Sequence, residues 1–423
     1  MERINEINNM QSGITENIED PKQLELLYRK NKVLFKQAFN SLYTDLNNNA
    51  IAQAWHERLN YQEEEINWEI SSELKMVALI AFLTGLLAKS PQIFDIDPDY
   101  FFSRNIGLIA FPMLMFFFAW KQGLAWKSML LPIIAVVVSG LYINLLPKNE
   151  KSDTLLLACI HLPILLWTML GFAFAGGDMK SVGKKIGFLR YNGDLVVMSA
   201  VMVLSGILFT GMTFGLFEII GLDITSFYVD YVVIWGLSTI PVLATFMVRN
   251  NPQLVDKISP TIAKIFTPLV TITLLVFLSA MAFTRKNIYQ DREFLMIFNA
   301  LLIGVMAIIL FSVSEATKKE NNRISLLFLF ALSILTIITN GIALSAIGFR
   351  IFEYGITPNR LAVLGSNLLI FTNLIWITHQ LLKSIKKKAE AESVEQAIAF
   401  FLPIYGLWTA IVVFIIPVLF GFK

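Results

Sequence analysis

The chain of 423 residues is poor in charged side chains, in cysteine and in histidine. Charged residues make up 16% of it, against about 25% in an ordinary soluble domain. The single cysteine, Cys159, excludes an intrachain disulfide and a multi-cysteine zinc site. The three histidines, His56, His161 and His379, lie far apart without metal-ligand spacing. The sequence therefore predicts no metal site and no other cofactor.

Other signatures are missing as well. The net charge of +2 is too small to predict a nucleic-acid partner. G-x-S-x-G, H-E-x-x-H and Walker motifs do not occur, so no catalytic residue is predicted, and whether the protein is an enzyme stays open on this basis. The opening residues, MERINEINNM, lack a basic segment followed by an apolar core, which predicts that there is no cleavable signal peptide.

Long apolar runs are what the sequence has in abundance, since 56% of its residues are hydrophobic. A transmembrane helix needs about 20 mostly apolar residues to cross a core of about 30 Å. Eleven runs qualify, and they predict an all-α, polytopic transmembrane helix bundle whose partner is the lipid bilayer. The predicted spans are residues 73–91, 102–119, 127–146, 154–175, 195–217, 227–248, 261–283, 294–313, 324–345, 361–382 and 398–420. The first is the weakest, because Lys75 interrupts it and it ends at Lys89.

The distribution of Lys and Arg among the short loops predicts the orientation. These residues are more numerous in the loops that share a side with the N-terminus. We therefore expect a multi-pass protein of the inner (plasma) membrane with a cytoplasmic N-terminus and with Lys423 outside. One miscounted span would reverse every loop that follows it.

The sequence divides into a soluble helical segment, residues 1–70, and a transmembrane domain, residues 71–423. Residues 1–19 are polar and rich in Asn and Glu, and we expect them to be flexible. Helix signals begin at Asp20, which can cap a helix whose first position is Pro21.

Two helices are predicted in the soluble segment, forming a small hairpin. The first shows an apolar face made by Leu27, Leu34, Phe35, Ala38, Phe39 and Leu42. The second covers residues 51–61 and carries Trp55 and Leu59 on one side. So short a hairpin cannot build a large core. We therefore expect it to lean on the membrane domain or on a cytoplasmic protein partner.

The most distinctive stretch lies between the ninth and tenth spans. Arg350 and Glu353 are three residues apart, so on a helix they share a face. Gly355 and Pro358 break the helix, and Arg360 follows at the start of the next span. Two guanidinium groups beside one carboxylate predict either an ion-pair clasp that joins two helices or a site for an anionic ligand.

A second stretch, residues 187–194, precedes the fifth span. Asn192 and Gly193 predict a turn, and Asp194 is suited to cap the helix that follows. The basic residues beside it are Lys184, Lys185 and Arg190. They are interpreted as a positive-inside anchor or as a binding site for anionic lipid headgroups.

Isolated polar residues lie within or near the spans. They are His161, Glu218, Asp230, Asn299, Asn340, Asn367 and Asn373. Ionisable groups at membrane depth indicate function by default, but the two carboxylates fall near span ends, where they can reach water. The asparagines are typical of interhelical hydrogen bonds. His161 is interpreted as a packing residue or as a proton relay.

These features together resemble a known family. The runs 350–360 and 189–194, the Gly- and Thr-rich fifth span and the opening Asp20-Pro21-Lys22-Gln23-Leu24 resemble an uncharacterised bacterial membrane family, domain of unknown function 4153. The resemblance covers nearly the whole chain and implies a bacterial inner-membrane protein. It implies no activity, substrate or catalytic residue.

Three functions remain open on the sequence. The leading hypothesis is a transport-like protein that binds or moves a small solute, an ion or a lipid, which requires a polar site near the midplane. The second is an accessory, sensory or scaffold protein whose hairpin docks a cytoplasmic partner through an apolar patch. The third is a membrane-embedded enzyme for a lipid-linked substrate, which requires clustered ionisable groups near one interface.

Overall fold

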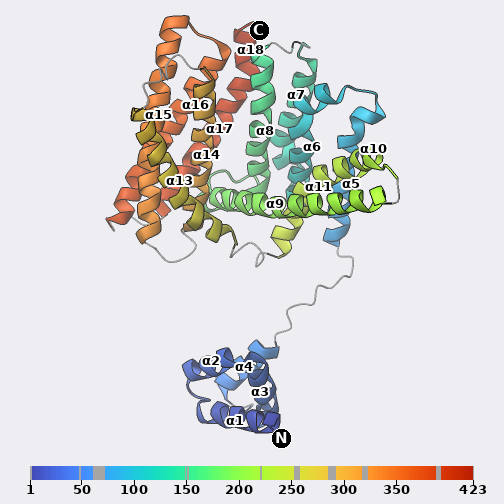
Figure 1. The fold of residues 1–423 in the computed structure, drawn as a ribbon, viewed down its shortest axis with the longest axis vertical. Coiled ribbons are helices and arrows are strands. Elements are labelled where there is room, and N and C mark those ends of the chain that lie inside the picture. Colours follow the sequence, from blue (N-terminus) through green and yellow to red (C-terminus); the bar gives the residue numbers. More distant parts are fainter. Residues whose placement is uncertain are drawn as a thin grey trace. The chain divides into compact units, whose positions relative to one another are not determined.

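The computed structural model describes residues 2–46, 49–60, 72–147, 149, 152–219, 222–251, 258–283, 292–316, 323–386 and 392–422. Nearly all of these residues are helical and none of them forms a strand, so the all-α prediction is confirmed (Figure 1). The chain folds as two units, Met1–Ser71 and Ser72–Lys423.

The first unit has four helices around its own core and is larger than the predicted hairpin. The helices are α1 (Glu2–Glu16), α2 (Pro21–Lys30), α3 (Lys32–Leu46) and α4 (Ala50–Asn60). Their buried residues are Ile14, Leu24, Phe35, Ala38, Phe39, Ala52, Trp55 and Leu59. Phe35 and Phe39 are buried as predicted, whereas Leu27 and Leu34 are half-buried.

The expectation of a flexible start is wrong, because residues 2–16 form helix α1. Ile7, Met10 and Ile14 recur at helical spacing, and this stripe packs onto the core of the unit. The predicted cap at Asp20 is confirmed, since its carboxylate accepts the backbone N–H of Lys22 at 2.9 Å.

The second unit is the membrane domain, and a helix falls on each of the eleven predicted spans. Its helices are α5 (Ser72–Ile93), α6 (Pro98–Lys121), α7 (Trp126–Leu145), α8 (Asp153–Phe174), α9 (Val182–Ile219), α10 (Thr225–Tyr228), the π-helical η1 (Val229–Val233), α11 (Ile234–Asn250), α13 (Ile258–Phe283), α14 (Arg292–Ala316), α15 (Arg323–Tyr354), α16 (Pro358–Ile385), α17 (Glu392–Ala410), the π-helical η2 (Ile411–Ile415) and α18 (Ile416–Leu419).

Length and composition identify a multi-pass membrane protein. Within the described residues, eight helices are long and apolar enough to cross a membrane, and α13 and α14 contribute two shorter apolar runs. The predicted first span, α5, is not among these eight.

The two largest hydrophobic cores of the second unit define two lobes. The first lobe contains α5 to α8 with α11, and Phe118 and Leu166 lie at its centre. The second lobe contains α13 to α17, with Leu332 and Leu374 at its centre. Trp167, on α8, packs against both cores.

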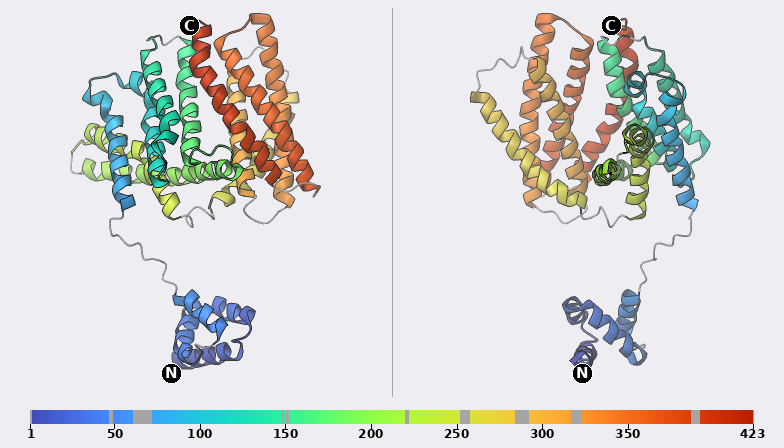
Figure 2. Two further views of the ribbon diagram at one scale, coloured as in Figure 1. Left: turned by 180° about the vertical axis from the view of Figure 1, so that it is seen from behind. Right: turned by 45° about the vertical axis from the view of Figure 1, so that its right-hand side comes forward.

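Helix α9 joins the lobes by lying across the other helices, as all three views show (Figures 1 and 2). Its first half contributes Phe188 and Tyr191 to the first core and Ile186 and Leu189 to the second. The fifth predicted span, residues 195–217, is the second half of this transverse helix.

The predicted turn at Asn192 and Gly193, with Asp194 as a cap, is wrong because α9 runs through these residues unbroken. The Asn192 side chain instead donates to the Phe188 carbonyl at 2.6 Å and accepts the Trp167 indole N–H at 2.8 Å. A Cβ atom on Gly193 would lie 1.9 Å from the Phe311 ring. The glycine therefore permits a close helix contact and does not end a helix.

Candidate functional site

A buried lysine marks the contact between α5 and the helix that contains η1. Lys89 is 6% exposed. Its ammonium donates to the Gln92 side-chain oxygen and to the backbone carbonyl of Asp230, and it lies 4.0 Å from the centre of the Tyr231 ring. Gln92 in turn donates to the Asp230 carboxylate at 3.0 Å. One amide side chain therefore bridges a buried cation and a carboxylate.

The π-helical turn explains why the Asp230 carbonyl accepts a lysine. The N–H of Ile234 bonds to the carbonyl of Val229, five residues back. In an α-helix that N–H would bond to Asp230, so the turn releases the Asp230 carbonyl and Lys89 donates to it. Such turns within α-helices often occur at functional sites. The sequence pointed to Asp230 and missed Lys89, although Lys89 ends a predicted span.

In the second lobe, three predicted asparagines meet. Asn367 of α16 donates to the side-chain oxygen of Asn299 on α14 at 2.7 Å. Asn340 of α15 donates to the backbone carbonyl of Asn367 at 3.1 Å. A chain of amide groups therefore connects three neighbouring helices, which is the arrangement expected of interhelical hydrogen bonds.

The described interior of the second lobe contains polar residues beside its hydrophobic core, and none of the buried ones is charged. Its buried polar residues are Thr267, Thr271, Ser312, Ser333, Thr336, Thr339, Asn340, Asn367, Asn373, Ser384 and Thr409. Most of the hydroxyl groups of these residues donate to a carbonyl of their own helix.

Two amide oxygens in this interior have no hydrogen-bond partner among the described residues. They belong to Asn340 and Asn373, both of which are fully buried. The Asn373 nitrogen donates to the Tyr405 hydroxyl at 2.9 Å, so only its oxygen is left over. Buried oxygens are normally bonded, because leaving one without a donor costs about 1–3 kcal/mol. Each of the two oxygens therefore keeps unused hydrogen-bond acceptor capacity.

The predicted headgroup residues are held by protein groups. Lys185 donates to the backbone carbonyl of Ala399 on α17 at 3.1 Å. Pro403 has no N–H to give to that carbonyl four residues back, so Lys185 replaces the missing helical hydrogen bond. Arg190 forms an ion pair with Glu395 at 3.1 Å, and these side chains are 22% and 14% exposed. Lys185 and Arg190 thus tie α9 to α17, a role that the sequence did not indicate.

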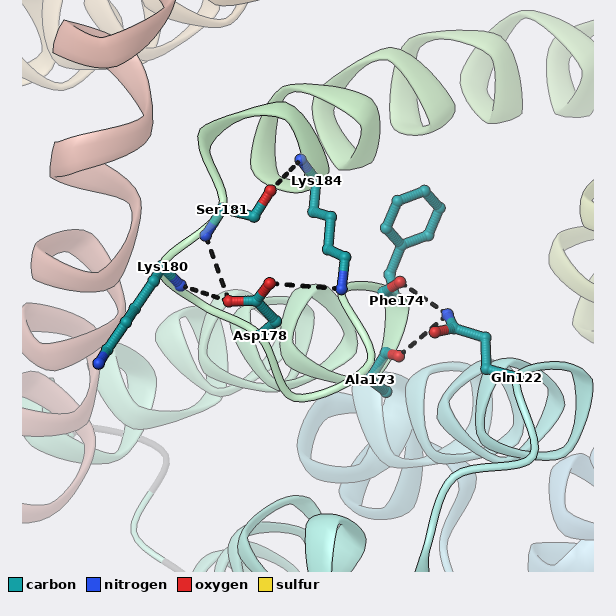
Figure 3. Close-up of polar contacts among 7 residues, drawn as sticks. All are labelled: Gln122, Ala173, Phe174, Asp178, Lys180, Ser181 and Lys184. Carbon is teal, nitrogen blue, oxygen red and sulfur yellow. Dashed lines mark hydrogen bonds and ion pairs between the residues drawn. The ribbon is translucent and has the colours of Figure 1, made fainter.

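The third basic residue, Lys184, lies in the first turn of α9 and contacts the turn between α8 and α9 (Figure 3). Lys184 lies 3.4 Å from the carboxylate of Asp178, which also accepts the backbone N–H groups of Lys180 and Ser181. The bond from the Lys180 N–H is the main reason why the pKa of Asp178 is lowered from its ordinary value. Gln122, at the end of α6, donates to the last carbonyls of α8, including that of Phe174 at 2.7 Å. Headgroup binding by the basic residues stays a prediction.

The ion pairs predicted around Glu353 are wrong. Glu353 is exposed near the end of α15, and neither Arg350 nor Arg360 forms an ion pair with it. Arg360 donates instead to the backbone carbonyls of Tyr354 and Gly355, at 2.9 and 2.6 Å. The last carbonyls of a helix lack internal donors. The left-handed turn at Gly355 (φ 77°) brings these carbonyls to Arg360, which caps α15 and connects it to α16.

A second arginine repeats this capping arrangement in the first lobe. Arg104 of α6 is 4% exposed and donates to the carbonyls of Ile143, Leu146 and Pro147 at the end of α7. Both arginines therefore satisfy helix ends, and an anion-binding role for Arg350 and Arg360 stays a prediction.

The remaining candidates lie apart from one another. The Nδ1 atom of His161 is 2.9 Å from the Leu157 carbonyl, one turn back on α8, as a packing histidine would be. Glu218 is exposed near the end of α9. Within the described residues, no group of three or more His, Cys, Asp or Glu side chains could hold a metal ion.

The comparisons with known proteins leave the family open. No family model, no curated protein and no solved structure matches the chain. The resemblance to domain of unknown function 4153 therefore stays a prediction.

Proposed function

We propose that this membrane protein is transport-like and that it binds a small polar solute or a monovalent cation inside the second lobe. The observation that supports this proposal most is the pair of buried amide oxygens, on Asn340 and Asn373, without a partner among the described residues. They lie on adjacent spanning helices, α15 and α16.

The surroundings define the chemical class of the ligand. An amide oxygen accepts hydrogen bonds and coordinates hard cations, but it repels anions. The described interior of α13 to α17 has no buried charged side chain that could neutralise a multiply charged ligand. A solute that donates hydrogen bonds, or a cation of single charge, fits these groups best.

Flux measurements test the proposal directly. The purified protein is placed in liposomes, and the uptake of small neutral solutes is followed by light scattering. The uptake of monovalent cations is followed with a fluorescent indicator. We expect flux above that of empty liposomes, and we expect Asn340→Leu and Asn373→Leu to lower it at least tenfold. Leucine is close to asparagine in shape and removes the amide oxygen together with the amide nitrogen, which donates to Asn367 or Tyr405.

Ser139 offers a matched control, because its hydroxyl is also buried without a partner among the residues that the structure describes, but lies on α7 of the first lobe. Ser139→Ala should leave flux unchanged. A wild-type protein without flux for either class of solute, or Asn variants that carry solute normally, would contradict the proposal.

The proposal includes the inner membrane as location and a cytoplasmic N-terminus. The supporting observation is the excess of Lys and Arg in the loops on the N-terminal side. Reporter fusions at both ends test the orientation, and the N-terminal reporter should be cytoplasmic while the C-terminal one is external. Two reporters on the same side would contradict it.

A further inference from the structure

One face of helix α2 combines an exposed leucine with basic residues. Leu26 is 53% exposed and is the only large hydrophobic side chain exposed on the described part of the first unit. Lys22 lies four residues before it, and Arg29 and Lys30 lie three and four residues after it. Helical spacing places all four on the same face, and all four are exposed. These residues are called the α2 face below.

The charge around this face is unbalanced. Residues 26–44 contain four Lys or Arg residues and no Asp or Glu. Two carboxylates lie beside this face: Asp20 accepts the backbone N–H of Lys22 at 2.9 Å, and Glu25 lies 2.8 Å from Arg29 and 2.7 Å from Arg58. One negative charge is therefore shared between two guanidinium groups, and Lys22 and Lys30 remain as additional positive charges. The surface is suited to an anionic partner.

The chain itself keeps this unit close to a membrane. Residues 61–71 join α4 to α5, the first helix of the second unit, and any chain of eleven residues spans at most about 40 Å when fully extended. Such a tether gives the unit a high effective concentration at the bilayer surface. A leucine surrounded by basic residues is typical of a helix face that rests on anionic lipid, with its apolar side chain at the acyl boundary. A protein partner would require a larger apolar area than one side chain offers.

We propose that the α2 face binds anionic lipid headgroups of the membrane in which the protein resides, with Leu26 inserted among them. The first unit is then a domain that docks on the bilayer according to its lipid composition. This docking site is separate from the amide groups of the proposed transport function.

A fluorescent label on α2 tests the inference in the full-length protein. Cys159→Ser removes the only cysteine, and Gln23→Cys adds one at an exposed position beside the α2 face. An environment-sensitive dye on that cysteine is read in nanodiscs of phosphatidylcholine alone and in nanodiscs with about one third phosphatidylglycerol. We expect quenching by acrylamide, a neutral quencher, to fall at least twofold when phosphatidylglycerol is present. High salt should reverse the effect, because it screens the charges.

Matched variants separate this face from net charge alone. Lys22→Gln with Lys30→Gln should abolish the protection, and Leu26→Ser should weaken it. Thr44→Glu with Ala54→Glu changes the net charge by the same amount at exposed positions on α3 and α4. This control should leave the protection from acrylamide unchanged. Equal quenching in both lipids would overturn the inference. Protection of the dye from acrylamide by soluble polyglutamate, without protection by phosphatidylglycerol, would overturn the inference in favour of an acidic protein partner.

Discussion

Gly193→Ala tests whether α9 lies where the structure places it. A Cβ atom at this position would lie 1.9, 2.3 and 2.9 Å from three atoms of the Phe311 ring on α14. Ordinary van der Waals contact begins at 3.4 Å, so the closest ring atom would have to withdraw by 3.4 − 1.9 = 1.5 Å. Gly206, farther along the same helix, has open space around its Cβ position and provides the control.

The two substitutions differ only in this clash. Alanine stabilises a helix interior by about 1 kcal/mol relative to glycine, and both variants gain that amount. Overpacking a core costs about 1–3 kcal/mol. The difference between the two variants therefore isolates the steric cost, and Gly206→Ala should be more stable than Gly193→Ala by about 1–3 kcal/mol.

Thermal unfolding in detergent measures this difference. Cys159 is half-buried and is the only cysteine, so a thiol-reactive dye reports its exposure on unfolding. At about 2 °C per kcal/mol, Gly193→Ala should melt about 2–6 °C below Gly206→Ala. Adding Phe311→Leu to Gly193→Ala should restore part of the loss, because the smaller side chain makes room. Equal melting temperatures for the two glycine variants would refute the contact between α9 and α14.

Three further predictions concern charged groups. Arg190→Glu and Glu395→Arg should each lower the free energy of unfolding by about 1–3 kcal/mol, because each breaks the ion pair between α9 and α17. The double variant restores opposite charges and should recover part of the loss in melting temperature, and no recovery would count against the ion pair. The pKa of Glu25 is lowered from 4.5, first by the hydrogen bond from Arg29, so its stabilising effect is complete above pH 4.5 and is lost as the pH falls through the lower folded-state pKa. Glu25→Gln should remove this acid-dependent loss of stability, which circular dichroism of the first unit would detect, and an unchanged acid profile would count against the pairing. Arg360→Gln should speed hydrogen exchange in the last turn of α15, whereas unchanged exchange would show that the cap contributes nothing.

The pattern of apolar residues was enough to predict the class of the protein. A helix that crosses a bilayer must satisfy its backbone internally and expose apolar side chains, and both demands are local. For this reason each predicted span contains a helix, and Asp20 caps α2 as its sequence context indicates. The core of the first unit was predicted only in part, because the periodic residues of α1 are few among many polar ones.

Tertiary structure decided the remaining features, because they depend on contacts between distant segments. Asn192 and Gly193 are typical turn residues, yet Trp167 and Phe311 from other helices make them suitable for the middle of α9. Lys185 has its role because Pro403, far along the chain, releases a carbonyl on α17. The sequence thus determined where helices form and that most of them are apolar enough to cross a membrane, whereas packing determined their directions and the partners of their polar groups.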